Sequence, residues 1–156
     1  MLPIDQFAAL LKTMKGITLS GAAFDGALSS SNQSPIQNTP EGTAIFFSQQ
    51  TAFSTGTAAF GVNSNGPVTM AVVELTGYDD NRPTQAPIQI AVNGAIVYQG
   101  DSPFPNADWG TFGILLRDSS VLRQGSNQIT IRNMATQGRI LEPPWFLIQS
   151  VTIHYR

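Results

Sequence analysis

Apolar and polar residues alternate along the second half of the chain, and this pattern predicts β-strands. In the segment 88–92 large apolar residues alternate with small or polar ones, as expected for a strand with one buried face. The next two residues, Asn93 and Gly94, suit the two positive φ angles of a type I′ turn and predict a hairpin with 95–98. Similar patterns predict further strands at 111–116, 122–132 and 146–155.

The first half of the chain combines strand patterns with one helical pattern. Strands are predicted at 17–19, 44–50, 56–62 and 67–77, and the last is expected to be central because it is rich in Val and Leu. Between residues 4 and 15, apolar residues recur at spacings of three and four, which predicts a short helix that stops at Gly16. The apolar stripe of this helix consists of Ile4, Phe7, Leu10, Leu11 and Met14.

This apolar stripe has two interpretations. It packs on the sandwich or closes one end of it, or it is an assembly contact with neighbouring subunits. The segment 29–35 is rich in Ser, Asn and Gln and has no periodicity, so it is expected to be a loop or an extended arm. The sequence therefore predicts two parts, a helix and arm over 1–43 and a sandwich over 44–156.

Three of these segments carry a resemblance to a known fold family. They are IQIAVNG at 88–94, LRQGSNQITIRN at 122–133 and FLIQSVTIHY at 146–155. They resemble the galactose-binding-like sandwich modules of glycoside hydrolases and polysaccharide lyases, and related carbohydrate-binding modules. The resemblance implies an all-β fold, an antiparallel jelly-roll β-sandwich of about eight strands. Lectin-like modules, enzyme accessory domains, receptor ectodomains and virion proteins share such sandwiches, so the resemblance leaves the function open.

The composition narrows the classes of function. A length of 156 residues suits one domain. The absence of Cys excludes disulfides, thiolate metal sites and Cys nucleophiles. Only 12% of residues are charged and the net charge is −2, which argues against nucleic-acid binding. No apolar run approaches the roughly 20 residues that span a bilayer, so membrane insertion is not expected.

A candidate site follows from the order of the strands. If each connection after residue 44 reverses the chain, the loops near 51–55, 78–86, 100–109 and 134–145 share one end of the sandwich. This end would hold both tryptophans, whose faces stack on sugar rings while carboxylates, amides and Arg bind hydroxyls. The alternative is that both tryptophans are core residues that close the end. The candidate glycan-binding residues are Tyr78, Asp80, Asn81, Arg82, Asp108, Trp109, Arg139, Glu142 and Trp145.

Metal binding and catalysis have weaker signals. Asp79 and Asp80 are candidate oxygen ligands for a structural Ca²⁺, although acidic loop residues also form simple turns. No other cofactor is expected. Gly100-Asp101-Ser102 matches the nucleophile block of GDS-type esterases, but the later Asp-x-x-His is missing, because Val151 precedes the only histidine, His154. Paired carboxylates among Asp101, Asp108 and Glu142 could in principle serve glycoside hydrolysis, but a small sandwich with short loops offers little substrate cleft. The sequence predicts a protein that is not an enzyme.

Two functions remain, and they predict different partners and locations. The first is a non-catalytic structural or attachment subunit of a larger assembly, such as a bacteriophage capsid, tail or baseplate, built on a carbohydrate-binding-like sandwich. It is favoured by the starting Met without a signal peptide, the long N-terminal arm and the low charge, and its partners are copies of itself or neighbouring subunits. The alternative is a carbohydrate-binding module of a secreted polysaccharide-active enzyme, located outside the cell or at its surface, with a polysaccharide or surface glycan as partner.

Overall fold

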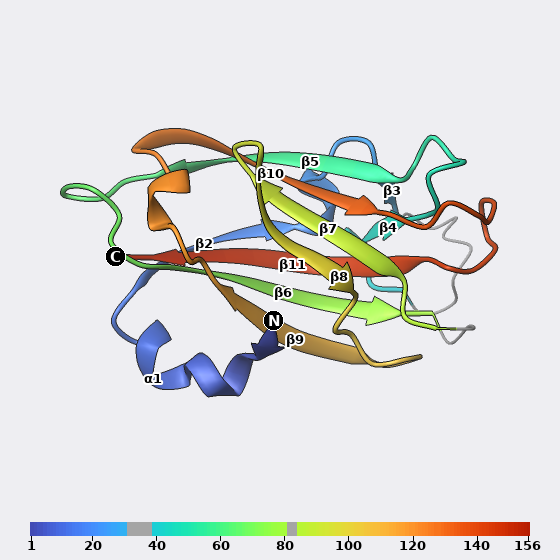
Figure 1. Cartoon of the computed structure of the whole chain (residues 1–156), viewed down its shortest axis with the longest axis horizontal. Coiled ribbons are helices and arrows are strands. Elements are labelled where there is room, and N and C mark those ends of the chain that lie inside the picture. The colour runs from blue at the N-terminus through green and yellow to red at the C-terminus, as the bar shows by residue number, and fades with distance from the viewer. Residues whose placement is uncertain (31–38, 81–83) are drawn as a thin grey trace.

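The computed structural model describes residues 1–30, 39–80 and 84–156, which form two antiparallel β-sheets packed face to face (Figure 1). Within this part, the larger sheet has seven strands: β1 (Leu2–Pro3), β2 (Lys15–Ser20), β3 (Leu28–Ser29), β4 (Ala44–Phe46), β6 (Ala71–Asp79), β9 (Trp109–Leu115) and β11 (Phe146–Tyr155). The smaller sheet has four: β5 (Thr55–Val62), β7 (Pro87–Val92), β8 (Ala95–Asp101) and β10 (Gly125–Asn133). The predicted all-β, jelly-roll sandwich is confirmed.

The strand order shows which strands are central in each sheet. In the larger sheet the order is β1-β9-β6-β11-β4-β3, and β2 also pairs with β11. Strand β11 pairs with β6 along its whole length, whereas β2 pairs with 150–155 and β4 with 146–148 on its other edge. The smaller sheet has the order β5-β10-β7-β8. The longest strand pairing, β6 with β11, therefore lies inside the larger sheet, whereas β5 and β8 are the two edges of the smaller sheet.

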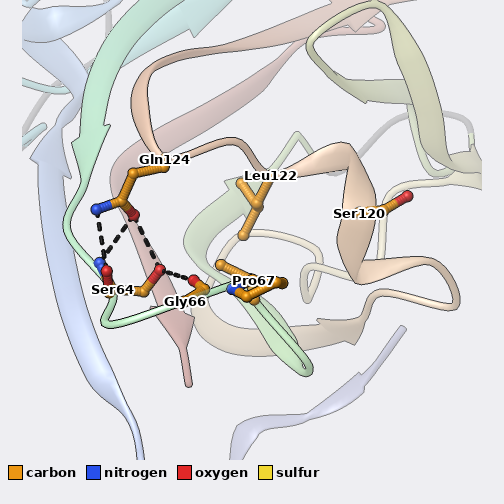
Figure 2. A pocket seen from close by; sticks show the side chains of 7 residues that line it. Ser64, Gly66, Pro67, Ser120, Leu122 and Gln124 are labelled. Atoms are coloured by element: carbon orange, nitrogen blue, oxygen red, sulfur yellow. Dashed lines mark hydrogen bonds between the residues drawn. The ribbon is translucent and has the colours of Figure 1, made fainter.

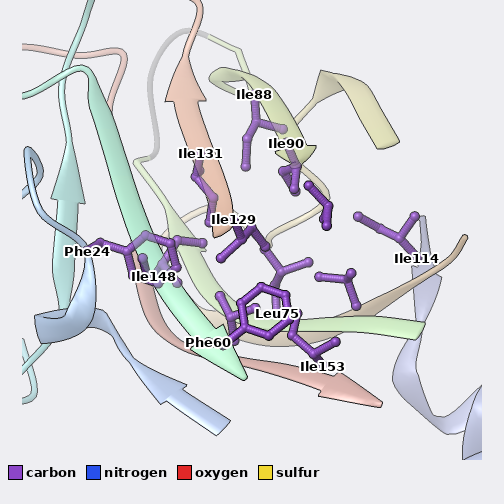
Figure 3. Packing of buried hydrophobic residues seen from close by; sticks show 14 of the residues in the cluster. Phe24, Phe60, Leu75, Ile88, Ile90, Ile114, Ile129, Ile131, Ile148 and Ile153 are labelled. Atoms are coloured by element: carbon purple, nitrogen blue, oxygen red, sulfur yellow. The ribbon is translucent and has the colours of Figure 1, made fainter. Parts of the chain in front are cut away.

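Alternate residues of both sheets form the main core between them (Figure 3). Leu75 from the larger sheet and Ile90 and Ile131 from the smaller sheet are fully buried there. The rings of Phe46 and Phe146 stack at 4.9 Å between centroids. Gly77 also faces inward, and a Cβ at this position would lie 2.5 Å from the ring of Phe104. Glycine is therefore needed near the apical end of β6 for this close approach.

The predicted strands agree with the observed ones except at their ends. The strand predicted over 44–50 stops at Phe46, because the next N–H, that of Phe47, donates to the carbonyl of Phe53 and turns the chain. The strand predicted over 67–77 starts only at Ala71, because the N–H groups of Thr69 and Met70 both donate to the last residue, Arg156. These differences arise from contacts between distant parts of the chain.

The N-terminal part joins the larger sheet. The helix predicted over 4–15 is shorter, a 3₁₀ turn η1 (Ile4–Phe7) followed by α1 (Ala8–Leu11), and β2 already begins at Lys15. A second short turn, η2 (Gly21–Ala23), follows β2. Residues 1–43, predicted as a helix and arm, thus supply β1, β2 and β3 to the larger sheet. Residues 31–38, which contain most of the predicted arm, lie outside the described residues.

The apolar stripe of the N-terminal helix faces this chain's own sheet. Phe7 is buried, and the other stripe residues, Ile4, Leu10, Leu11 and Met14, are half-buried. The ring of Phe7 covers Gly113 of β9, where a Cβ would lie only 2.8 Å from the ring. This placement agrees with the packing interpretation of the stripe. The assembly contact stays a prediction.

Successive connections lie at alternate ends of the sandwich, as the site prediction required. We call the end where β6 ends and β7 begins, with the loops 47–54, 102–108 and 134–145, the apical end. The opposite, basal end carries 63–70, the Asn93-Gly94 turn and 116–124, which includes η3 (Ser119–Val121). In Figure 1 the apical end lies on the right and the basal end, with the C-terminus, on the left. In the described part of the chain no helix has the length and apolar character needed to cross a bilayer.

Candidate functional site

Three aromatic residues gather at the apical end. Tyr78 lies next to the last residue of β6, and Trp109, the first residue of β9, pairs with it. Trp145 immediately precedes β11. The rings of Tyr78 and Trp145 are nearly parallel, at 4° and 6.1 Å between centroids. The Trp109 ring lies 5.5 Å from Tyr78 and is tilted by 54°. All three side chains remain partly exposed. We call these residues the aromatic cluster.

The aromatic cluster lies on the outer face of the larger sheet. Leu75 and Gly77 of β6 point into the main core, so Tyr78 points to the other face by the alternation of a strand. A second, small core lies on that face, and it includes Leu147, the cross-strand partner of Tyr78 on β11. Its buried members are Ile45, Phe47 and Leu147, and Leu28, Phe53 and the aromatic cluster pack around them. The two tryptophans thus support a small core while parts of their rings stay accessible.

Asp80 fixes the backbone of Trp145. Its carboxylate Oδ2 accepts a hydrogen bond of 2.6 Å from the Trp145 N–H, and its own N–H donates to the Trp145 carbonyl at 3.3 Å. Asp80 is buried. Its predicted role as a direct glycan contact stays a prediction, while the geometry gives it a clear role in positioning Trp145.

Asn133 fixes the same loop from the other side. It is fully buried at the end of β10, and its side-chain amide donates to the carbonyls of Phe46 and Pro144, both at 3.0 Å. Its Oδ1 accepts from the N–H of Ala135 at 3.0 Å. The sequence analysis missed this residue, because its partners are known only once the two sheets pack against each other.

Asp79 is a buried carboxyl group at the end of β6. Its Oδ2 accepts hydrogen bonds from the hydroxyl of Ser102 and from the N–H of Ala86, and its Oδ1 has no hydrogen-bond partner. Burial raises the pKa of Asp79 from 3.8 to about 6; the two hydrogen bonds oppose this shift, and the negative charges of Asp80 and Asp101 add to it. The main-chain groups of Asp79 also bind residues 105 and 107, so this residue joins two apical loops.

The carboxylates of Asp79 and Asp80, the predicted calcium ligands, both bind protein donors. Asp79 accepts hydrogen bonds from Ser102 and Ala86, and Asp80 accepts one from Trp145. Residues 1–30, 39–80 and 84–156 contain no group of three or more His, Cys, Asp or Glu side chains arranged for a metal ion. Calcium binding therefore gains no support from this geometry and stays a prediction.

The remaining candidate residues are exposed on apical loops or lie outside the described residues. Asp108 Oδ1 accepts from the N–H of Trp109 at 2.8 Å, which caps the start of β9. Arg139 and Glu142 belong to one exposed turn, closed by a 3.0 Å hydrogen bond from the Glu142 N–H to the Arg139 carbonyl. Arg139 also lines a hollow of about 570 Å³ beside the loop that carries Gln50. Asn81 and Arg82 lie outside the described residues.

The basal end has a hollow of a different kind, about 520 Å³ in volume (Figure 2). The N–H of Ser64 donates to Gln124 Oε1, and Gln124 Nε2 donates back to the Ser64 carbonyl, both at 3.0 Å. The lining residues include no aromatic or charged side chain: they are Ser64, Gly66, Pro67, Val68, Ser120, Leu122 and Gln124. Because its amide and hydroxyl groups bind each other, this hollow is a weaker candidate for a ligand site.

Comparison with known proteins relates the fold, but no particular family, to this chain. No protein-family model and no curated protein sequence matches it. Among solved structures, the CBM36-1 domain of a multidomain xylanase from the hindgut metagenome of Trinervitermes trinervoides is similar, with a TM-score of 0.58 and 10% identity over 90% of this chain and 96% of that domain. A family 35 carbohydrate-binding module from Clostridium thermocellum gives a TM-score of 0.56 and 17% identity over 89% and 97%.

A third structure places the same fold in a larger enzyme. In the GH26-CBM35 β-(1,4)-mannanase of Podospora anserina the match has a TM-score of 0.56 and 15% identity, and covers 90% of this chain but 28% of the enzyme. At these identities the likeness shows the fold alone. The chain has the galactose-binding-like β-sandwich fold found in carbohydrate-binding modules, as its sequence resemblance predicted.

Proposed function

We propose that this protein is a non-catalytic carbohydrate-binding module that binds a polysaccharide through the aromatic cluster at its apical end. The observation that carries the proposal is the arrangement of Tyr78, Trp109 and Trp145, which are partly exposed and pack on a small buried core. Rings held in this way present a fixed, water-accessible apolar face, and such a face stacks on the C–H face of a sugar ring. Preorganised rings also lose little conformational entropy when they bind.

Exposed polar side chains complete the proposed site. Asp108, Arg139 and Glu142 lie at the apical end with their charged groups accessible to solvent. Carboxylates and guanidinium groups hydrogen-bond to sugar hydroxyls and so orient the ring on the aromatic faces. Asp80 and Asn133 act one step further away, because they hold the loop that presents Trp145.

Catalysis has no support among the described residues. The only histidine, His154, forms a 2.6 Å pair with Glu74, which lies four residues before Tyr78 on β6. At about 3.3 Å per residue, Glu74 is roughly 13 Å from the aromatic cluster along the strand. The buried apical acids Asp79 and Asp80 bind protein donors instead of facing solvent. These observations favour binding over bond cleavage.

The structural neighbours favour the carbohydrate-binding interpretation over the virion interpretation. Two are carbohydrate-binding modules of about this length, and another is a mannanase with an attached module. We therefore place the proposed function outside the cell, with a polysaccharide as partner and a carbohydrate-active enzyme as the expected context. These neighbours give no support to a capsid, tail or baseplate subunit.

Calorimetric titration with soluble polysaccharides tests the proposal. Mannan, xylan and laminarin are suitable first probes, followed by glucans and acidic polysaccharides. We expect at least one to bind, and the double variant W109A/W145A to lose binding while it still melts cooperatively. Gln124→Ala, in the basal hollow, is the matched control and should bind like the wild type. Absence of binding across the neutral and acidic probes, or binding that the folded double variant retains, would refute the proposal.

A further inference from the structure

Strand β8 forms an open edge of the smaller sheet. It pairs with β7 on one side, and no other strand in the described part of the chain pairs with its second side. The Ser102 N–H donates to the Ala86 carbonyl, which continues the β7–β8 ladder. Along an antiparallel strand, the N–H and C=O groups of successive residues point alternately toward the partner strand and away from it. Gln99 and Asp101 therefore direct their main-chain groups away from β7. The Asp101 carbonyl accepts from the Tyr98 hydroxyl, while the N–H and C=O of Gln99 point to where a further strand would pair.

The surface beside this edge is apolar. Among the described residues, three of the five large hydrophobic side chains that are exposed lie here: Leu2 at 48%, Ile96 at 58% and Leu115 at 47%. They line one groove of about 570 Å³ between β8 and β9. Soluble proteins usually protect an edge strand with Lys, Pro or inward-pointing charges. Residues 95–100 contain none of these, although the strand ends in Asp101 and has a bulge opposite Ile90 and Ala91.

The charges beside the groove favour a second copy of this chain as the occupant. Arg117 and Ile96 both line the groove. Ile96 lies at the basal end of β8, and Asp101 lies at the apical end of the same strand. The side chains of Arg117 and Asp101 are both exposed. When two copies of β8 pair antiparallel about a two-fold axis, each strand begins where the other ends. Arg117 of each copy then faces Asp101 of the other, so the edge is complementary to itself in charge as well as in backbone direction.

We propose that two copies of this protein form a symmetric dimer by antiparallel pairing of their β8 strands. The two smaller sheets then join into one continuous sheet, and Leu2, Ile96 and Leu115 are covered at the junction. The apical ends point in opposite directions, because the paired strands do. Where the proposed function holds, the dimer carries two aromatic clusters at its far ends and binds polysaccharide chains with increased avidity.

Sedimentation velocity over a concentration series, without glycan, tests the dimer independently of the proposed function. We expect the wild-type protein to change from monomer to dimer as its concentration rises. Ile96→Lys places a charge in the junction and should give a monomer at all concentrations. Ile140→Lys is the matched control, because Ile140 is similarly exposed but lies on the apical loop before β11. It should dimerise like the wild type.

A charge exchange gives a second, independent test. Arg117→Asp and Asp101→Arg should each weaken the dimer by about tenfold, since each replaces two attractions with two repulsions. The double variant R117D/D101R should restore the wild-type dissociation constant. Circular dichroism melting verifies that each variant is folded. A wild-type monomer up to about millimolar concentration, a dimer that Ile96→Lys leaves intact, or a double variant without recovery would overturn the proposal.

Discussion

The two ends of the sandwich use similar residue types for different purposes. Strand β10 has a buried asparagine near each end, Asn127 at the basal end and Asn133 at the apical end. Asn127 binds the main chain of Arg123 and Gly125 and the amide of Asn93. These partners form a closed network among polar groups of one end. Asn133 instead binds the loop that presents Trp145.

This difference separates a structural end from a candidate binding end. At the basal end, amides and hydroxyls satisfy one another, as Ser64 and Gln124 do, and little remains for a ligand to bind. At the apical end, buried polar groups hold the backbone, while aromatic faces remain accessible. Hydrogen-bonding capacity alone is therefore a poor guide to a site in this protein. What distinguishes the apical end is the combination of buried polar supports and partly exposed aromatic rings.

Replacement of the two asparagines should give the largest effects and tests this comparison directly. Asn133→Ala and Asn127→Ala each remove several buried hydrogen bonds and leave main-chain groups unpaired, so each should lower the free energy of unfolding by about 3 kcal/mol. Only Asn133→Ala should also weaken polysaccharide binding, because only Asn133 holds the Pro144 carbonyl next to Trp145. Urea unfolding and calorimetric titration measure the two effects. Equal binding by both variants would mean that the apical support does not orient Trp145.

The pH dependence of stability should also distinguish the two ends. Asp79 has a raised pKa of about 6 because it is buried, so between pH 3.8 and 6 the folded state keeps a proton that the unfolded state loses. Its contribution therefore destabilises the fold as pH rises through this range, by about 3 kcal/mol at roughly 1.4 kcal/mol per pH unit. At the basal end the hydrogen bonds from Ser120 lower the pKa of the exposed Asp118. The effect of pH on stability through Asp118 is therefore opposite to that through Asp79: the contribution of Asp118 to stability is lost as pH falls.

Asp79→Asn isolates the apical contribution. It keeps an oxygen for Ser102 and Ala86 but removes the charge, so at pH 8 it should raise the free energy of unfolding by about 2 kcal/mol. Below pH 4 the variant and the wild type should be equally stable. Chemical denaturation from pH 4 to pH 8 measures this difference, with Asp118→Asn as the control. A constant difference across the range would contradict the buried, raised-pKa carboxyl.

Asp79 and Asn133 also show which parts of the structure could be predicted from the sequence. The strands followed from alternation, and the sharing of one end by Tyr78, Trp109 and Trp145 followed from the reversal of successive strands. The same alternation could have identified Asp79 as inward-facing, because it lies in phase with Leu75 and Gly77. The partners of Asn133 could not be predicted, because they depend on the register between distant segments.

The outer-face core was also beyond prediction. Ile45 and Leu147 lie in the registers of β4, β6 and β11, and a strand buried on both faces has no alternation to indicate which side is inner. For this reason the sequence left open whether the tryptophans were core residues or ligand platforms. The structure shows that parts of their rings are buried against this core and parts are accessible. Short β1 and β3 were missed as well, because two residues carry no periodic signal.

At Gly94 the local sequence alone was sufficient to predict the turn. Replacing this glycine should have a smaller effect on stability than the changes above. Its φ of 84° lies in the left-handed region, next to Asn93 at 50°, as the predicted turn requires. Gly94→Val should therefore lower the free energy of unfolding by about 1–2 kcal/mol. Polysaccharide affinity should not change, since the turn is far from the aromatic cluster. Gly61→Ala, at an exposed position of β5 with open space around its Cβ, is the control and should have little effect on melting.

The smallest expected effects come from two exposed aspartates that cap backbone N–H groups at opposite ends. The Asp108 carboxylate accepts from the N–H of Trp109. The Asp118 carboxylate accepts from both the N–H and the hydroxyl of Ser120. Both variants, Asp108→Ala and Asp118→Ala, should change the melting temperature by no more than about 2 °C, because exposed caps contribute little. Asp108→Ala should nevertheless weaken polysaccharide binding by about threefold, since it removes a carboxylate beside Trp109 that would accept a hydrogen bond from a sugar hydroxyl. Calorimetric titration of the two variants side by side measures this difference. If Asp118→Ala weakens binding as much as Asp108→Ala does, ligand contacts extend to the basal end, and the division of labour between the two ends is wrong.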